Sequence, residues 1–328
     1  MEKRLQEILK VALKYHVTDI HFSLTEKDDP EVIIEMRVDG VIQQMKPGKD
    51  DVRLFHYLMY RANLDITSSF VPQTGSFQIE IDNTWISARF ALVNSFQRTS
   101  GVLRILNGGG GLQIDQLSYD KQVTKYFDTL LQHRTGLFVF SGPTCSGKTT
   151  TLYTLLNACT GKKIYTLEDP IEVISDKYIQ LQVNEKQHLS YADGIKQLMR
   201  HDPDIVMIGE IRDSEAARMA VRCALTGHLV VTTLHASDCT GAIHRLLDLG
   251  ADRYQLMDVL LGISNQRLYS APHHLKTGVY ECMNRKEVEY WFTHHQLPYE
   301  HISLQEKIRK AVERNEISYS EACSDLVE

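Results

Sequence analysis

One eight-residue stretch constrains this chain more than any other part of its sequence. It is Gly142-Pro143-Thr144-Cys145-Ser146-Gly147-Lys148-Thr149, which matches the phosphate-binding pattern G-x-x-x-x-G-K-[ST]. The apolar run 137–140 before it predicts a buried strand, and leucines at helical spacing after it predict a helix over residues 150–158. The stretch therefore lies between a strand end and a helix start, which is the context that a phosphate-binding loop requires.

The residue types of this loop suit a nucleoside triphosphate. Glycines let backbone N–H groups close round the phosphates, and the N-terminus of the following helix adds a favourable dipole. Lys148 is expected to reach the β and γ phosphates, and the Thr149 hydroxyl to ligate Mg²⁺. We therefore expect ATP and Mg²⁺ as cofactors. The expected ATP-binding residues are Gly142, Pro143, Thr144, Cys145, Ser146, Gly147, Lys148, Thr149 and Thr150.

Composition excludes several other classes of protein. The hydrophobic content of 43% and charged content of 24% are ordinary for a globular chain, and 328 residues suggest two domains. The net charge of −6, without a basic stripe, argues against direct binding of nucleic acid. The six cysteines show no C-x-x-C spacing, which fits a reduced, cytoplasmic setting. No signal peptide or apolar run of about 18 residues is present, so a membrane role is expected to need a partner.

The first third of the chain predicts a small α+β domain over residues 1–106. Its pattern consists of a helix to about Tyr15, two strands, a second helix and three more strands. Asp39-Gly40 predicts the hairpin turn between the first two strands. The predicted strands cover residues 19–24, 31–38, 75–81, 85–93 and 101–106, and the second helix covers residues 51–64.

Four consecutive glycines, Gly108 to Gly111, mark the clearest boundary in the chain. Glycine runs form neither helix nor strand readily, so we expect an interdomain hinge in a linker over residues 107–116. Residues 117–328 are then expected to form the ATPase domain. Its last segment, residues 276–328, is expected to be a helical tail, with helices over 302–313 and 319–326.

Beyond the linker, strand and helix patterns alternate as they do in a parallel sheet. Strands are predicted over residues 163–167, 204–208 and 228–234, and helices over 191–200 and 214–225. Ligands of open parallel sheets lie at the carboxyl ends of the strands. The polar residues that fall at such ends, beside the phosphate-binding loop, are Glu168, Asp169, Glu210 and His235.

Hydrolysis of a phosphoanhydride needs a metal and a residue that orients the attacking water. Glu210 follows an apolar strand, but Gly209 stands where an aspartate is usual. Glu210 is therefore expected to act on Mg²⁺ through its water shell or on the attacking water itself. Glu168 is the other candidate base, and the sequence leaves the choice open. His228 and His235 either sense the γ-phosphate or are held within the sheet.

In combination, four motifs resemble those of the secretion ATPases of type II secretion and type IV pili, over about Asp19 to Leu268. They are the loop itself, Leu-Glu-Asp-Pro-Ile-Glu, Gly-Glu-Ile-Arg-Asp and Thr-Gly-His-Leu-Val-Val-Thr-Thr-Leu-His. The resemblance implies a RecA-like P-loop motor domain with a smaller PAS-like N-terminal domain, in a hexameric ring. It implies Glu168 as catalytic base, Glu210 as the Walker B glutamate, and His228 with His235 as the family's His box.

The same resemblance gives a role to two arginines of the N-terminal strands. A strand arginine usually faces solvent. In the family, arginines at the positions of Arg89 and Arg104 neutralise the phosphates at a closed interface. The resemblance therefore implies that both belong to the catalytic set.

Three segments resemble the assembly branch of the family rather than the retraction branch: Val102 to Leu106, His244 to Asp252, and Leu260 to Leu268. The short form, which starts almost at the PAS-like domain, is similar to the competence-pilus ATPases that drive a DNA-uptake pseudopilus. This implies an inner-membrane platform protein as partner, pilins as indirect partners, and a place at the cytoplasmic face of the membrane. A retraction motor and a nucleotide-gated scaffold are the alternatives.

The sequence departs from the family at two places. Many relatives carry a four-cysteine zinc module after Leu268, whereas this chain has His273, His274 and, further on, Cys282. We expect a polar loop there rather than a metal site. Cys145 also replaces a glycine that is common in the family's loop. Its position beside a helix N-terminus makes it a hypothetical oxidation site.

Overall fold

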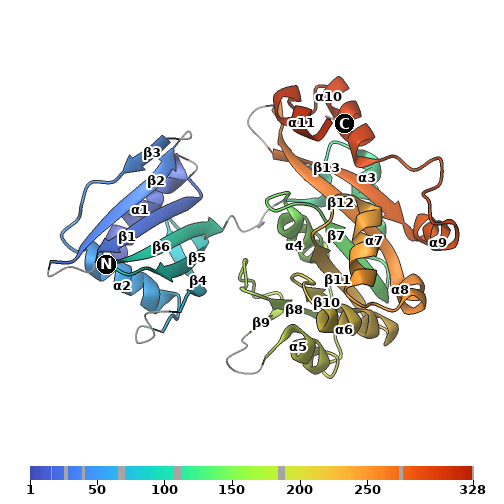
Figure 1. The fold of residues 1–328 in the computed structure, drawn as a ribbon, viewed down its shortest axis with the longest axis horizontal. Coiled ribbons are helices and arrows are strands. Elements are labelled where there is room, and N and C mark those ends of the chain that lie inside the picture. The colour runs from blue at the N-terminus through green and yellow to red at the C-terminus, as the bar shows by residue number, and fades with distance from the viewer. Residues whose placement is uncertain are drawn as a thin grey trace. The chain divides into compact units, whose positions relative to one another are not determined.

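The computed structural model describes residues 1–15, 17–25, 29–38, 41–65, 71–106, 112–183, 189–272 and 276–326. The chain divides into two compact units (Figure 1). Unit 1 comprises Met1–Gly108 with Pro170–Ile174, and unit 2 comprises Gly109–Asp169 with Ser175–Glu328. The predicted hinge glycines and the predicted turn at residues 39–40 lie outside the described residues.

Unit 1 is built on a six-stranded sheet in the order β3-β2-β1-β6-β5-β4. Each strand runs antiparallel to its neighbours. The strands are β1 (Asp19–Thr25), β2 (Glu31–Val38), β3 (Val41–Gln44), β4 (Gln73–Ile81), β5 (Thr84–Asn94) and β6 (Arg98–Leu106), and the helices are α1 (Glu2–Lys14) and α2 (Asp51–Arg61).

Alternation along these strands gives unit 1 a core on one face of its sheet. Successive side chains of a strand point to opposite faces, and in β2 every second residue is buried. The buried stripes of α1 and α2 belong to the same hydrophobic cluster as those strand residues. Phe22, Phe55 and Phe90 meet there edge to face, with ring centroids 5.7–6.5 Å apart.

Unit 2 is built on a seven-stranded sheet in the order β13-β12-β7-β11-β10-β8-β9. All neighbouring pairs are parallel except β12 and β13, which pair antiparallel. The strands are β7 (Gly136–Ser141), β8 (Ile164–Glu168), β9 (Ile179–Gln182), β10 (Ile205–Ile208), β11 (Leu229–Leu234), β12 (Leu260–Ser270) and β13 (Lys276–Asn284). This arrangement confirms the predicted α/β class with a parallel sheet.

Helices follow most strands of unit 2. They are the short η1 (Ile114–Gln116), then α3 (Lys121–Leu130), α4 (Lys148–Ala158), α5 (Tyr191–Leu198), α6 (Ser214–Leu225), α7 (Cys239–Asp248), α8 (Arg253–Val259), α9 (Arg285–His294), α10 (Leu304–Glu313) and α11 (Tyr319–Leu326). Aspartates and serines cap several N-termini; Asp213, for example, accepts bonds from the backbone N–H groups of Glu215 and Ala216 at the start of α6. β7, β8, β10 and β11 are buried along their whole length, as expected for strands covered on both faces.

The expectation of a helical tail over residues 276–328 is wrong in its first part. Residues Lys276–Asn284 form β13, a nine-residue strand of the main sheet. The strand was hard to predict because it buries Glu281, a residue type that normally marks an exposed position. The helices predicted near residues 302–313 and 319–326 are confirmed as α10 and α11.

The buried Glu281 belongs to an ionic cluster that ties β13 to α9 and to the loop before α10. His301 lies between two carboxylates, with Nε2 2.9 Å from Glu281 Oε1 and Nδ1 2.9 Å from Glu287 Oε1. Burial alone would lower the pKa of His301, but the hydrogen bonds with both glutamates outweigh it and raise the pKa to about 9. We call these three residues the His301 cluster.

Candidate nucleotide-binding site

The phosphate-binding loop lies where the sequence predicts it, between the end of β7 and the start of α4. β8, β10 and β11 run parallel to β7 in one sheet, so their carboxyl ends reach the same edge. Cross-strand bonds close this edge, including the Gly209 amide donating to the Leu167 carbonyl (2.8 Å) and the Thr233 hydroxyl donating to the Gly209 carbonyl (2.6 Å). Glu168, Glu210 and His235 therefore leave the sheet on the side of the loop.

The loop backbone needs residues that tolerate the left-handed region. Gly142 has φ +143°, and a Cβ there would lie 2.6 Å from the Gln266 carbonyl oxygen, so a side chain is excluded. Cys145 has φ +62° although it carries a side chain. A left-handed residue of this kind costs about 1–2 kcal/mol relative to glycine, which adopts this region without that cost. The Cys145 thiol itself is exposed.

Lys148 points into the loop. Its side chain is only 8% exposed, and its Nζ donates to the carbonyls of Gly142 (2.9 Å) and Pro143 (2.8 Å). Thr149 follows it in the first turn of α4 and is half-buried. The ammonium and the helix N-terminus thus concentrate positive charge at one place.

Glu168, the last residue of β8, is 3% exposed and held by three different elements. Its carboxylate accepts from the Tyr153 hydroxyl on α4 at 2.7 Å, from the Thr166 hydroxyl on β8 at 2.7 Å, and from the Gln180 amide on β9 at 3.3 Å. Because α4 begins at the phosphate-binding loop, the hydrogen bond from Tyr153 connects Glu168 to that loop through the helix.

Glu210 has a different environment, with a side chain that is 20% exposed. Arg212 Nη2 lies 2.8 Å from its Oε2, and His235 Nε2 lies 3.4 Å from its Oε1. The structure therefore brings Glu210 and His235 together, as their places at strand ends predict.

His228 is separated from His235 by the whole of β11. Its Nδ1 lies 3.0 Å from the Cys223 carbonyl and 3.2 Å from the Thr226 hydroxyl, at the end of α6. The six residues of β11 span about 20 Å, so His228 lies at the opposite edge of the sheet. Of the two alternatives that the sequence left open, this placement favours a histidine held within the sheet.

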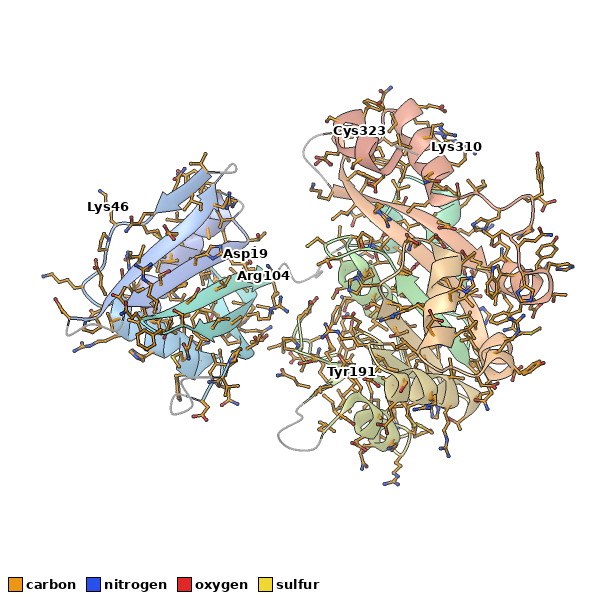
Figure 2. The ribbon with its side chains drawn as sticks, in the orientation of Figure 1. Asp19, Lys46, Arg104, Tyr191, Lys310 and Cys323 are labelled. Atoms are coloured by element: carbon orange, nitrogen blue, oxygen red, sulfur yellow. The ribbon has the colours of Figure 1, made fainter. Side chains whose placement is uncertain are left out.

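Arg89 and Arg104 lie in unit 1, directly opposite each other on β5 and β6. Arg104 Nε is 2.6 Å from Asp19 Oδ1 on β1, and Figure 2 shows these two side chains together on the sheet. Both arginines have the strand parity that points away from the hydrophobic core, because their neighbours Ala88, Phe90 and Leu103 are buried. Their role toward phosphates stays a prediction.

Sequence reasoning missed the polar residues beneath the loop. Ser264, Asn265 and Gln266 are consecutive on β12 and essentially fully buried. The Asn265 amide donates to the Ser141 hydroxyl (2.8 Å) and the Gln266 amide to the Ser146 carbonyl (2.7 Å). The available signal was a run of polar residues inside an otherwise apolar segment, which is unusual for a buried strand.

Tyr191, at the start of α5, is a further residue that the sequence did not single out (Figure 2). Burial raises the pKa of its hydroxyl, and the charges of Asp169, Arg212 and Glu210 are close enough to act on it. The phenol of Tyr191 is therefore within electrostatic range of the strand-end carboxylates.

Two negative findings apply to the described ranges. No helix there is long and apolar enough to cross a membrane. No three histidine, cysteine, aspartate or glutamate side chains gather there in a way that could hold a metal ion. His273 and His274 lie outside these ranges, so the sequence expectation for the zinc-module region stays a prediction.

Known proteins resemble this chain over most of its length. The family model described as "Type II/IV secretion system protein" matches residues 1–318. Competence protein ComGA of Bacillus subtilis (strain 168) is 36% identical over 273 residues, covering 82% of this chain and 76% of that protein. Type II secretion system protein E of Pseudomonas aeruginosa is 37% identical over 270 residues, covering 80% of this chain and 53% of that protein. The chain thus spans about half the length of that second relative.

Solved structures resemble the whole chain. The pilus retraction motor PilT with bound ADP matches with a TM-score of 0.74 and 25% identity, covering 98% of this chain and 96% of that one. The Legionella pneumophila ATPase DotB matches in fold with a TM-score of 0.74 and 18% identity, covering 99% and 96%. The extent of the family match, together with a phosphate-binding loop beside strand-end carboxylates, identifies this chain as a member of the type II/IV secretion system protein family.

Proposed function

We propose that this protein is a hexameric motor that hydrolyses Mg-ATP and powers assembly of a competence type IV pilus or pseudopilus for DNA uptake. The observation that carries the proposal is one sheet edge on which an enclosed Lys148 lies beside two strand-end carboxylates, Glu168 and Glu210. A protein that only binds nucleotide has no need of both acids at that edge. The likeness to ComGA supports the competence branch.

The loop residues suit the phosphates of ATP. Phosphate oxygens would replace the carbonyls of Gly142 and Pro143 as acceptors for the Lys148 ammonium. The hydroxyl of Thr149 and the carboxylate of Glu210 are oxygen donors of the kind that Mg²⁺ prefers, and we assign both to it, Glu210 through water. Bound Mg²⁺ would neutralise charge on the β and γ phosphates.

The two acids take different roles in this proposal. Glu168 is the base that orients the attacking water, because donors from α4, β8 and β9 fix its carboxylate in one orientation. Glu210 keeps contact with Arg212 and His235 and serves the metal's water shell and the γ-phosphate.

Arg89 and Arg104 complete the site in the assembled ring, where they neutralise phosphate charge. Arg104 must leave Asp19 to do so. The side chains of that pair are 47% and 27% exposed, and ion pairs so accessible to solvent contribute about 0–1 kcal/mol. The cost of release is therefore small. Arg104→Ala is expected to retain ATP binding and lose turnover; turnover at the wild-type rate would show the arginine assignment to be wrong.

The motor is proposed to act on an inner-membrane platform protein at the cytoplasmic face, and on pilins only through it. Retraction is the second candidate, favoured by the match to PilT over almost the full length of both chains. A nucleotide-gated scaffold with little hydrolysis is the third.

The experiment is phosphate release with Mg²⁺ across a range of protein concentrations, for wild type and Lys148→Ala. Specific activity that rises with concentration and vanishes in the variant supports a ring with shared sites. If the protein binds ATP but shows no hydrolysis at any protein concentration, even after the platform protein is added, the result favours the nucleotide-gated scaffold instead. Assembly and retraction are then separated by whether pili lengthen or shorten in cells that depend on this protein.

A further inference from the structure

The C-terminal helix α11 is fastened to β12 by acidic side chains. Asp325 accepts from the Tyr269 hydroxyl at 2.7 Å and pairs with Arg267 Nε at 3.4 Å. Glu321 accepts from the Ser270 backbone N–H at 2.7 Å. Ala322 is fully buried in a small apolar cluster with residues of β12, β13 and α10. α11 is therefore a docked element of unit 2.

Arg267 joins this helix to the strands around the phosphate-binding loop. Besides Asp325, its guanidinium donates from Nη1 to the Asn265 side-chain oxygen (3.0 Å) and the Gln266 carbonyl (3.1 Å). It also donates from Nη2 to the Ser237 carbonyl (3.4 Å), two residues beyond His235. A planar group with several fixed donors can hold these acceptors together, whereas a lysine cannot.

The two residues before Arg267 carry the connection into the loop. The Asn265 amide donates to the Ser141 hydroxyl at the loop's entry and to the Ala236 carbonyl (3.0 Å). The Gln266 amide donates to the Ser146 carbonyl near the loop's end, and the Gln266 carbonyl lies against Gly142. Each step of the path from α11 to both ends of the loop is thus a direct contact.

Two buried atoms on this path have no hydrogen-bond partner within the described part of the chain. They are Gln266 Oε1 and Ser146 Oγ. An unsatisfied buried polar atom costs about 1–3 kcal/mol, so this region of the loop favours any rearrangement that supplies partners.

We propose that Arg267 is a positioning residue of the nucleotide site, and that α11 sets the geometry of the phosphate-binding loop through Asp325 and Arg267. The proposal rests on nucleotide binding at that loop, as argued above. Neither Arg267 nor Asp325 touches the nucleotide; they act through Asn265 and Gln266. Affinity for Mg-ATP then depends on a helix near the end of the described chain.

The test measures the dissociation constant of a fluorescent ATP analogue with Mg²⁺, on the full-length protein. Asp325→Asn is expected to weaken binding about fivefold and Arg267→Lys about tenfold. Asp325→Glu, which keeps the charge, is expected to stay within about twofold of wild type. Tyr269→Phe, which removes only one bond to Asp325, provides a milder variant if the others fold poorly.

A matched control lies at the opposite end of β12. Arg285 and Glu289 lie one turn apart on α9 and pair at 2.8 Å, and Arg285 also donates to the Leu260 carbonyl at the start of β12 (3.1 Å). Glu289→Gln therefore breaks an arginine–carboxylate pair whose arginine contacts the other end of the same strand. This variant is expected to bind the analogue within about twofold of wild type. Equal losses of affinity in Glu289→Gln and Asp325→Asn would mean a general loss of strand stability and would overturn the proposal.

A second readout does not require nucleotide. The exposed Cys145 thiol lies in the loop, so its alkylation rate, followed by peptide mass spectrometry, reports loop geometry directly. Asp325→Asn and Arg267→Lys are expected to change this rate at least twofold, and Glu289→Gln to leave it unchanged. If wild type binds no nucleotide, the proposed function fails while this readout still decides the inference. Unchanged rates of Cys145 alkylation in both Asp325→Asn and Arg267→Lys would overturn the inference.

Discussion

The described part of unit 2 contains two places where histidine and glutamate side chains meet, and they differ in what surrounds them. At the sheet's carboxyl edge, Glu210 contacts His235 with both side chains partly open to solvent. In the His301 cluster the histidine and Glu281 are each only 3% exposed. The same residue types therefore serve a proposed reaction in one place and hold β13, α9 and the loop before α10 together in the other. The exposure of the side chains to solvent distinguishes the two places, whereas residue type does not.

The largest expected effect concerns the carboxyl edge. Lys148→Ala removes the ammonium that is enclosed in the loop, so ATP hydrolysis is expected to fall by a factor of about 100 or more. The unfolding temperature of the variant is expected to remain close to that of wild type, since the hydrogen bonds of the Lys148 ammonium to the Gly142 and Pro143 carbonyls lie within the loop. Phosphate release and thermal unfolding, measured on the same samples, check both parts. If Lys148→Ala hydrolysed ATP at a tenth of the wild-type rate or more, the proposed contrast between the carboxyl edge and the His301 cluster would be wrong.

The His301 cluster is expected to give the opposite result. Glu281→Gln removes one of the two carboxylates that accept from His301, and a hydrogen bond between buried charged groups contributes about 1.5–3 kcal/mol of folding free energy. ATP affinity, measured well below the unfolding temperature, is expected to change less than about twofold. Denaturant unfolding provides the free energy. A variant with wild-type stability would show that this cluster does not hold the three elements together.

The pH dependence of stability sharpens the same contrast. The pKa of His301 is raised to about 9 in the folded protein, above its ordinary value of 6.5. Its contribution is therefore complete below pH 6.5 and is lost as the pH rises through 9. At about 1.4 kcal/mol per pKa unit, the loss amounts to about 3 kcal/mol. Unfolding free energies of wild type and of His301→Gln, each measured at pH 6 and pH 9.5, test this prediction. An equal change in unfolding free energy between the two pH values in both proteins would contradict it.

These two regions also differ in how far the sequence predicted them. The loop, Glu168 and Glu210 were predictable because short local patterns place them at strand ends, and the alternation of strands and helices supplies the parallel sheet. Glu281, Asn265 and Gln266 were not, because their partners come from elsewhere in the chain: His301 for the first, and the loop residues Ser141 and Ser146 for the others. Buried polar residues look like exposed ones until those partners are known.

The smallest expected effect compares His228 and His235, the two histidines that the resemblance assigns to a His box. His235→Ala is expected to lower hydrolysis about tenfold, because it removes a contact of Glu210 at the carboxyl edge. His228→Ala is expected to lower it less than about twofold, because His228 bonds to the end of α6 at the opposite edge. Parallel phosphate-release assays decide the order. Equal losses of hydrolysis in the two variants would mean that His228 affects the reaction although it does not lie at the carboxyl edge of the sheet of unit 2.

The most direct test of the account is a Glu168→Gln variant assayed for ATP binding and for hydrolysis in the same preparation. Gln keeps the size of the side chain and its contacts with Tyr153 and Thr166 but cannot act as a base. We predict ATP affinity within about threefold of wild type and phosphate release reduced by a factor of about 100 or more. Hydrolysis at the wild-type rate would contradict the claim that the strand-end carboxylate performs the chemistry.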